Sequence, residues 1–338
     1  MTFDELFPCP DVQFVDVRAP IEFAQGHIPG AVNIPLFGDD ERAEIGTVYK
    51  QVDKDQALAL GEKIALPKVD RIVAEIRELL PAEIVIYCWR GGKRSGEICR
   101  VVNEAGIPAR RIHGGYKAYR RGIREFIESS RNLLMLGGKT GSGKTAILLG
   151  LKEKGVQVID LEGLANHKGS VFGHINEAPQ PTTEQFENNF CDELQKIDPQ
   201  QVLLLENESH LIGTVHLPPP LLLQMRAAPL LIVDVPIEAR IDRLVREYTS
   251  TDKQELIEAT KRIAKKLTLP KLLEVTAFLE QGDFHSACAI LLGYYDYYYN
   301  RGIDKRKNQE ISFLTLNGFD LDGDIALLLR DLDNMIAD

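Results

Sequence analysis

The eight residues GKTGSGKT, residues 138–145, constrain the fold of this chain more than any other stretch. They fit the pattern G-x-x-x-x-G-K-[ST], in which glycines let backbone amides wrap around a phosphate chain. The apolar run NLLMLGG before the motif is typical of a buried strand, and residues 144–155 after it have a helical pattern. This strand–loop–helix context predicts an α/β domain with a phosphate-binding loop, or P-loop.

Each residue type in the motif has a separate chemical role. Lys144 is expected to reach the terminal phosphates, and the Thr145 hydroxyl is expected to bind Mg²⁺. The residues predicted to bind the ligand are Gly138, Gly141, Ser142, Gly143, Lys144 and Thr145. The motif predicts a bound diphosphate but does not identify the rest of the ligand, so ATP, GTP and an organic diphosphate all remain open.

An acidic residue at a strand end should complete the predicted metal site. Asp160, Glu206 and Asp234 all follow apolar runs that are typical of strands. Among them, Asp160 and Glu206 are the predicted metal ligands beside Thr145.

A second constraint is the stretch IVIYCWRGGKRSGEICR, residues 84–100, where an apolar run ends at Cys88. Two glycines follow, which let the backbone turn its N–H groups inward, and Arg90, Lys93 and Arg94 add positive charge. Such surroundings favour thiolate and lower a cysteine pKa from its usual value of about 8.5. The stretch therefore predicts a nucleophilic Cys88 in a seat for an oxyanion or a chalcogen.

Length and strand pattern predict two domains in the 338 residues. Strand and helix patterns alternate up to about residue 126 and restart near residue 131, which indicates parallel sheets. The prediction is an N-terminal α/β domain over residues 1–128 and a P-loop α/β domain over 129–338. The second domain has a helical C-terminal part at about 250–305.

Charge and cysteine usage narrow the class of protein. The net charge of −10 argues against a general nucleic-acid binder, yet residues 88–124 carry ten Arg or Lys and only Glu97 and Glu104 as acids. This local reversal suggests either a defined anionic partner or a solvated helix face. The five cysteines are scattered and odd in number, and no apolar run reaches the roughly 18 residues of a membrane span. We therefore expect a cytoplasmic protein in which Cys9, Cys99, Cys191 and Cys288 are core residues.

The N-terminal part resembles a rhodanese domain. The resemblance rests on FVDVRAPIEFAQGHIPGAVNIP (14–35), the Cys88 loop and IHGGYKAYR (112–120), in matching order. Rhodaneses carry sulfur or selenium on the loop cysteine. Five residues separate Cys88 from Arg94, whereas simple rhodaneses usually have four and rhodanese-fold phosphatases have five. The loop alone therefore leaves chalcogen transfer and phosphate-ester hydrolysis open.

Over nearly its whole length the chain resembles the bacterial tRNA 2-selenouridine synthase family. The further motifs are DLEGLANHKGSVFG (160–173), QPTTEQFENNF (180–190) and LENESHLIG (205–213). The resemblance implies a transferase that acts on tRNA bearing 2-thiouridine at the wobble position. It implies S-geranylation with geranyl diphosphate, followed by replacement of the geranylthio group with selenium from selenophosphate.

This resemblance suggests a role for each loop. The P-loop would hold the diphosphate of the geranyl donor with Mg²⁺. Cys88 would carry selenium as a selanyl cysteine, and Arg90 and Arg94 would be catalytic residues that stabilise the departing phosphate. The basic surface of residues 88–124 would contact tRNA phosphates. The alternatives are a rhodanese-fold phosphatase or sulfurtransferase fused to a P-loop kinase, and a chalcogen carrier without tRNA turnover. The tyrosine-rich segment 291–302 could stack on bases or line a prenyl pocket, but half-buried packing is the preferred interpretation.

Overall fold

The structure is a computed structural model that describes the backbone of residues 12–80, 83–306 and 310–337. Contacts between Cα atoms divide the chain into two compact units. The first comprises Met1–Glu128 and Glu187–Gln195, and the second comprises Ser129–Phe186 and Lys196–Asp338. The sequence-based division at residue 128 did not anticipate that residues 187–195 group with the first unit. Cys9 lies outside the described residues.

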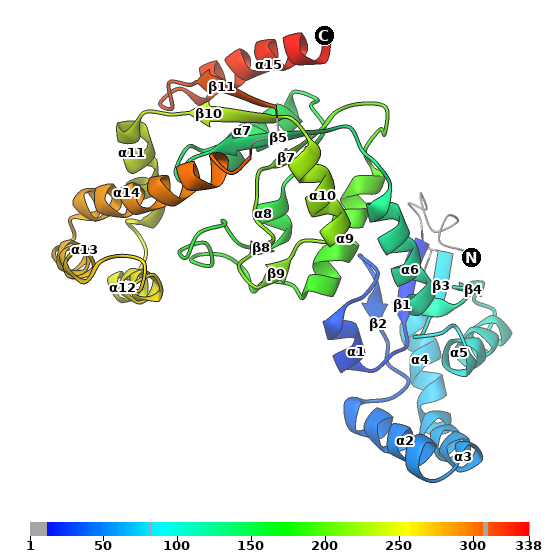
Figure 1. Ribbon diagram of the computed structural model, residues 1–338. Coiled ribbons are helices and arrows are strands. Elements are labelled where there is room, and N and C mark those ends of the chain that lie inside the picture. The colour runs from blue at the N-terminus through cyan, green and yellow to red at the C-terminus, as the bar shows by residue number, and fades with distance from the viewer. Residues whose placement is uncertain (1–11, 81–82, 307–309, 338) are drawn as a thin grey trace. The chain divides into compact units, whose positions relative to one another are not determined.

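The first unit contains a four-stranded parallel sheet in the order β2-β1-β3-β4 (Figure 1). Its strands are β1 (Val12–Asp16), β2 (Val32–Asn33), β3 (Glu83–Tyr87) and β4 (Ala109–Arg111). Its helices are α1 (Pro20–Gln25), α2 (Asp39–Gln51), α3 (Lys54–Ala65), α4 (Val69–Arg77), α5 (Lys93–Glu104) and α6 (Gly115–Glu128). A 3₁₀ turn at Leu66–Lys68 separates α3 from α4, as the proline at position 67 predicts. The acidic helix α2 was not anticipated.

The side-chain alternation of β3 places Cys88, the residue directly after the strand, on the same face as Ile84 and Ile86. Ile84 and Ile86 share a buried cluster with Cys88 and with apolar residues of α4 and α5. Tyr87 points to the opposite face, where its ring centroid lies 6.1 Å from that of Tyr116 on α6. The cysteine therefore emerges at the carboxyl edge of a parallel sheet, where α/β proteins bind their ligands.

The second unit contains a five-stranded parallel sheet in the order β11-β10-β5-β7-β6. Its strands are β5 (Leu133–Gly138), β6 (Val158–Ile159), β7 (Leu203–Glu206), β10 (Leu230–Asp234) and β11 (Ile311–Thr315). The expected α/β fold with parallel sheets is confirmed, because every strand pair in the two larger sheets runs parallel. The antiparallel hairpin of β8 (Leu211–Ile212) and β9 (Val215–His216) was not anticipated.

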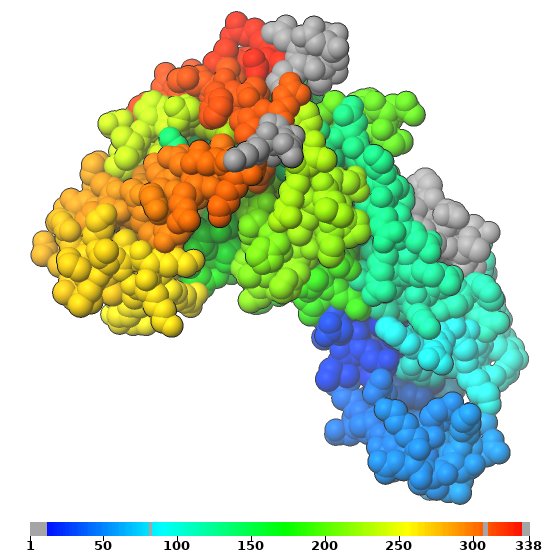
Figure 2. All heavy atoms as spheres, in the orientation of Figure 1, coloured from blue at the N-terminus to red at the C-terminus, as the bar shows by residue number. Residues whose placement is uncertain are grey.

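The helices that follow β5 fall into two groups. The first group is α7 (Lys144–Glu153), α8 (Leu161–Leu164), α9 (Thr183–Gln195, of which residues 187–195 group with the first unit), α10 (Pro219–Ala227) and α15 (Leu321–Ala337). The second is α11 (Ile237–Tyr248), α12 (Lys253–Arg262), α13 (Leu269–Gln281) and α14 (Phe284–Ile303). The yellow and orange side chains of α12–α14 lie together at the surface (Figure 2), and these helices have a core of their own. None of the helices in the described part of the chain has the length and apolar character to cross a membrane.

Candidate functional sites: a cysteine loop and a phosphate-binding loop

The cysteine loop is held against the turn that precedes α6. The Cys88 carbonyl accepts a hydrogen bond from the Tyr116 N–H, and the Trp89 carbonyl accepts one from the Lys117 N–H, both at 2.9 Å. At Gly115, whose φ is +62°, a Cβ atom would lie 2.2 Å from the Cys88 oxygen. Only glycine allows this close backbone approach, so the IHGGY turn fixes the position of the cysteine.

The environment of Cys88 favours the thiolate, in the direction expected from the sequence. The side chain is 3% exposed and its Sγ lies 3.2 Å from the Ser95 hydroxyl oxygen. Burial raises the pKa of the thiol, but hydrogen bonds from the Ser95 side chain and backbone, the charge of Arg94 and the Arg90 N–H oppose it. The net effect is a pKa below the ordinary value of a cysteine thiol. Sequence reasoning missed Ser95, because spacing along the chain does not show that its hydroxyl group reaches the Cys88 sulfur.

The two predicted arginines differ in their surroundings. Arg94 donates to Glu22 of α1 over 3.1 Å, and Arg42 approaches the same carboxylate at 3.6 Å. Burial alone would raise the pKa of Glu22, but Arg94 and Arg42 lower it, so this carboxyl group is held ionised. Arg90 is exposed at the mouth of the loop. Trp89 is 37% exposed, and its ring centroid lies 5.9 Å from that of Tyr116. The Trp89 side chain therefore packs against Tyr116 on one side and faces solvent on another.

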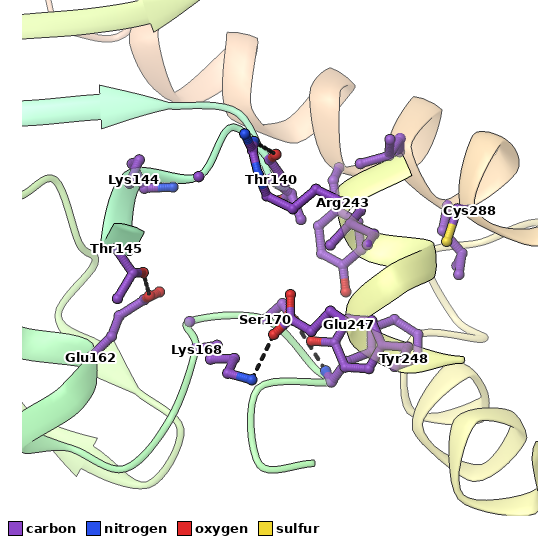
Figure 3. Close-up of a pocket in the computed structure, with 18 of the residues that line it drawn as sticks. Thr140, Lys144, Thr145, Glu162, Lys168, Ser170, Arg243, Glu247, Tyr248 and Cys288 are labelled. Atoms are coloured by element: carbon purple, nitrogen blue, oxygen red, sulfur yellow. Dashed lines mark hydrogen bonds and ion pairs between the residues drawn. The ribbon is translucent and has the colours of Figure 1, made fainter. Parts of the chain in front are cut away.

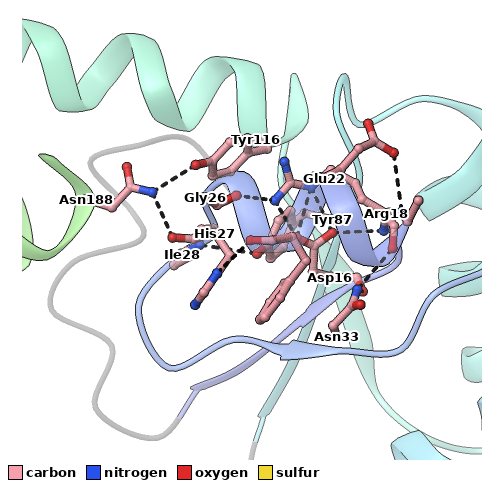
Figure 4. Close-up of polar contacts among 12 residues, drawn as sticks. Asp16, Arg18, Glu22, Gly26, His27, Ile28, Asn33, Tyr87, Tyr116 and Asn188 are labelled. Carbon is pink, nitrogen blue, oxygen red and sulfur yellow. Dashed lines mark hydrogen bonds and ion pairs between the residues drawn. The ribbon is translucent and has the colours of Figure 1, made fainter. Parts of the chain in front are cut away.

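A buried polar network stands behind the loop (Figure 4). Asp16 and Arg18 form an ion pair of 2.6 Å that is almost fully buried, and the Arg18 guanidinium lies 3.9 Å from the centre of the Tyr116 ring. Asn188 donates 2.8 Å hydrogen bonds to the Tyr116 hydroxyl and to the His27 carbonyl. Because the Tyr116 N–H binds the Cys88 carbonyl, this network supports the cysteine loop. The sequence motif around Asn188 was noted, but its role was not.

Several basic side chains of residues 88–124 form ion pairs with acidic residues, so less of the region's positive charge is available than its composition suggests. Arg100 pairs with Glu97 and Glu104, Arg110 with Glu83, and the buried Arg120 with Glu187. The part that remains exposed on α6 is a stripe of Lys117, Arg121 and Arg124, spaced by four and three residues along one helix face. This stripe begins two residues after the turn that supports Cys88. We call it the α6 stripe.

The thiol pKa leads to a direct prediction. Alkylation of Cys88 by iodoacetamide should have its midpoint at a lower pH than alkylation of an ordinary thiol, because the thiolate persists at more acidic pH. Replacement Ser95→Ala should move this midpoint to higher pH, since a hydrogen bond to the thiolate is lost. The measurement is the rate of Cys88 modification by mass spectrometry from pH 5 to 10. Identical midpoints in the two proteins would contradict the role of Ser95.

The phosphate-binding loop connects β5 to α7 as predicted, and α11 braces it. Gly141 and Gly143 have φ of +80° and +82°, conformations that favour glycine. The Lys144 ammonium donates to the Gly138 carbonyl over 3.1 Å. Arg240 Nε donates to the Thr140 carbonyl at 2.9 Å, and Arg243 Nη1 donates to the Gly141 carbonyl at 2.5 Å. Ser142 is buried, with its N–H donating to the Lys139 carbonyl over 3.1 Å.

Glu162 is the acid that contacts the P-loop threonine. The Thr145 hydroxyl donates to Glu162 Oε2 over 3.1 Å. Burial and the nearby charge of Glu208 raise the pKa of Glu162 to about 7, against the influence of Lys144 and Thr145. Burial also raises the pKa of Glu208. A cation beside these carboxyl groups would favour their ionised forms.

The two predicted metal ligands have backbone partners instead. Asp160 accepts from the Gly163 N–H over 2.7 Å and so caps α8, although it also borders the pocket. Glu206 is fully buried and accepts from the Leu161 N–H at 2.9 Å, and burial raises its pKa well above the usual value. Among the described residues, no group of three or more His, Cys, Asp or Glu could hold a metal ion. Mg²⁺ usually needs only one or two carboxylates plus substrate phosphates, so Thr145 and Glu162 fit it better than Asp160 and Glu206 do.

A pocket of about 610 Å³ extends from the P-loop to helices α11–α14. Lys144, Thr145 and Glu162 lie at one end and Cys288 at the other, with Arg243 and Tyr248 between them (Figure 3). Of the cysteines expected in the core, Cys191 is buried and Cys99 half-buried, whereas Cys288 is half-buried and lines this pocket. From the tyrosine-rich segment, Tyr295 and Tyr299 line the pocket and Tyr297 and Tyr298 are exposed.

The fold and the two loops define a rhodanese-like sheet with a cysteine loop, fused to a P-loop α/β unit. The sequence matches the rhodanese-like domain family over residues 2–121 and the tRNA 2-selenouridine synthase AAA domain family over residues 131–315. The chain therefore belongs to the tRNA 2-selenouridine synthase family.

Individual relatives agree with this assignment. The chain is 42% identical over 248 residues to a tRNA 2-selenouridine synthase of Bdellovibrio bacteriovorus, covering 70% of this chain and 65% of the relative. It is 43% identical over 242 residues to that of Shewanella loihica, covering 69% and 64%. The matched part thus spans slightly less than two thirds of these relatives. The N-terminal domain of a Clostridium difficile protein, described as ATP/GTP-binding, shares 38% identity over 36% of this chain and 97% of its own, with a TM-score of 0.35.

Proposed function

We propose that this protein is a cytoplasmic transferase that converts 2-thiouridine at the tRNA wobble position to 2-selenouridine through an S-geranylated intermediate. The observation that carries the proposal is the presence, in one chain of this family, of a thiolate-favouring cysteine loop and a P-loop. Each loop suits one of the two chemical steps. Geranyl diphosphate and selenophosphate are the proposed co-substrates.

In the first step, the P-loop binds the diphosphate of the geranyl donor. The sulfur of 2-thiouridine attacks C1 of the geranyl group, the C1–O bond breaks, and pyrophosphate leaves with the electron pair. The base loses its N3 proton when sulfur becomes alkylated. Lys144 neutralises the charge that develops on the leaving group, and Thr145 with Glu162 would hold Mg²⁺, which lowers the barrier further by the same electrostatic effect.

In the second step, the cysteine loop receives selenophosphate. The loop N–H groups of Arg90 and Ser95 point at the Cys88 sulfur, and the side chains of Arg90 and Arg94 supply positive charge for the phosphate moiety. Cys88 carries the selenium as a selanyl group. Formation of its S–Se bond from selenophosphate removes two electrons, which a small-molecule disulfide accepts, while the phosphoryl group passes to water. The selanyl selenium attacks C2 of the modified base and expels the geranylthiolate. A thiol then cleaves the S–Se bond, which returns the two electrons and releases 2-selenouridine from Cys88.

The α6 stripe is proposed to bind tRNA phosphates. Replacement of Lys117, Arg121 and Arg124 together by glutamine should weaken tRNA binding at least about tenfold and reduce its salt dependence, because three phosphate contacts are lost. The matched control is Arg100→Gln, since Arg100 is already paired with Glu97 and Glu104. Filter binding at several salt concentrations measures both quantities. Equal losses in the triple variant and the control would contradict the assignment of the stripe.

The decisive experiment supplies the purified protein with tRNA that bears 2-thiouridine, geranyl diphosphate, selenophosphate and Mg²⁺. Mass spectrometry of the digested tRNA should show S-geranylated 2-thiouridine first and 2-selenouridine later. Without geranyl diphosphate, selenouridine should not accumulate. If the tRNA remains unmodified under all these conditions, the proposed function is wrong.

One observation favours a second candidate, a rhodanese-fold phosphatase fused to a P-loop kinase. Five residues separate Cys88 from Arg94, which makes a loop able to enclose a tetrahedral phosphate. This candidate predicts hydrolysis of a generic aryl phosphate that Cys88→Ser abolishes. Such hydrolysis without any change in the tRNA would favour it over selenium transfer.

A further inference from the structure

The pocket beside the P-loop has two chemically different ends. At one end, Lys144, Thr145 and Glu162 present charged and hydroxyl groups (Figure 3). At the other end, α12 contributes Leu256, α13 contributes Leu279, and α14 contributes Phe284, Ala287, Leu291 and Leu292. Charged and amide side chains line the first end and are absent from these six lining positions. The pocket therefore suits a ligand with a polar head and an apolar tail.

The size of the pocket leads to the same conclusion. Its volume of about 610 Å³ lies within the roughly 300–1,000 Å³ of pockets that enclose a drug-sized molecule, so a diphosphate alone would leave much of it unfilled. The apolar end lies within the buried hydrophobic cluster of helices α12–α14, which includes Leu256, Leu279, Ala287 and Leu291. Apolar surface kept open within a core costs stability unless a ligand covers it.

One of the α11 arginines that contact the P-loop also connects the two ends of the pocket. Arg240 of α11 donates to the Thr140 carbonyl in the loop and forms a bidentate ion pair with Asp296 of α14, at 2.6 and 2.8 Å. The same helix α14 supplies the lining residues Ala287, Leu291 and Leu292 of the apolar end. The P-loop and the apolar wall of the pocket are therefore connected through a buried arginine.

We infer that the apolar arm of this pocket, formed by α12, α13 and α14, binds the hydrocarbon chain of a prenyl diphosphate and limits the length of chain accepted. This inference rests on the proposed function for the identity of the diphosphate ligand. Cys288 lies at the end of the arm away from Lys144 (Figure 3), so it is a specificity-determining position. A larger side chain there shortens the arm, and a smaller one lengthens it.

A nucleotide base is the rival occupant of the arm. Pockets for small molecules fix orientation through a few placed polar groups, and a base offers several hydrogen-bonding edges to such groups. Helices α12 and α13 and the first half of α14 present aliphatic, phenyl and thiol side chains, while their backbone polar groups are bonded within the helices. These walls match a hydrocarbon better than a base.

Calorimetry on the full chain with Mg²⁺ tests the inference. Pyrophosphate, dimethylallyl, geranyl and farnesyl diphosphates, together with ATP, form the ligand series. Geranyl diphosphate should bind at least about 100-fold more tightly than pyrophosphate, because several methylene groups are buried. Cys288→Phe should weaken geranyl diphosphate binding at least about tenfold without changing the affinity for pyrophosphate, and Cys288→Ala should improve farnesyl relative to geranyl diphosphate.

The matched control is His285→Phe, which places a phenyl ring at an exposed position on the same helix and should change no affinity in the series. Unchanged pyrophosphate binding by Cys288→Phe shows that this variant is folded; if it does not fold, the wild-type ligand series decides alone. Equal wild-type affinities for geranyl diphosphate and pyrophosphate would overturn the inference. Tighter binding of ATP than of geranyl diphosphate, lost in Cys288→Phe, would overturn it in favour of a base pocket.

The outcomes also separate this inference from the proposed function. If selenouridine forms in tRNA but geranyl diphosphate gains no affinity from the arm, only the inference fails. If the arm selects prenyl diphosphates but tRNA is never modified, the inference holds and the proposed function fails.

Discussion

Replacement Cys88→Ala is expected to lower the rate of selenouridine formation at least about 1,000-fold, because loss of a catalytic nucleophile typically has effects of this size or larger. Geranylation should continue, since the P-loop lies in the other compact unit and remains intact. S-geranylated 2-thiouridine should therefore accumulate in the tRNA. The measurement is nucleoside mass spectrometry of tRNA incubated with both co-substrates over a time course.

The control for this variant is Cys99→Ala. Cys99 lies on α5, eleven positions after Cys88, but burial raises the pKa of its thiol, and its sulfur donates to the Ala109 carbonyl over 3.3 Å. A thiol of this kind is a poor nucleophile, so selenouridine formation should be unchanged. Selenouridine formation at the wild-type rate in Cys88→Ala would remove the cysteine from the mechanism.

The second large effect is expected from Lys144→Ala. Its ammonium group lies at the polar end of the pocket, 3.1 Å from the Gly138 carbonyl. Removing a group that stabilises developing negative charge typically costs about 100- to 1,000-fold in rate. Geranylation should fall by this factor, whereas selenation of tRNA that has already been geranylated should proceed at the normal rate. Separate assays with 2-thiouridine tRNA and with pre-geranylated tRNA distinguish the two steps.

Lys154→Ala serves as the control for this variant. Lys154 is exposed at the C-terminal end of α7, the helix that begins at Lys144, so its loss changes the net charge by the same amount without touching the pocket. Both steps should be unaffected in this control. Normal geranylation by Lys144→Ala would show that the diphosphate binds elsewhere.

Sequence patterns predicted the two loops because each loop is nearly contiguous. The spacing from Gly138 to Thr145 already contains the geometry of a phosphate loop, and a buried strand ending at Cys88 already places that sulfur at a sheet edge. The sequence predicts the cations around Cys88 but not their partners. Arg94 forms an ion pair with Glu22, which offsets part of its positive charge. Ser95, whose hydroxyl oxygen lies 3.2 Å from the thiol, was not identified, because the sequence does not show which nearby side chain reaches the sulfur.

Metal ligands are harder to choose from a sequence, because a strand-end acid has several possible partners. Asp160 directly follows β6 and Glu206 ends β7, and the carboxyl groups of both accept hydrogen bonds from backbone amides of α8. Glu162 lies two residues after Asp160, and its carboxylate accepts a hydrogen bond from Thr145. Sequence position alone does not tell which way a carboxylate points.

From the sequence by itself follow the parallel α/β sheets, the phosphate loop and the ionisable cysteine, because each depends on local spacing and on hydrophobic periodicity. Only the tertiary structure decided that Asn188 supports the cysteine loop, that Glu162 contacts the P-loop, and that α12–α14 open an apolar arm ending at Cys288. The physical reason is that an apolar helix face has the same sequence pattern whether it lines a pocket or fills a core. Which of the two it does depends on how distant segments pack against it.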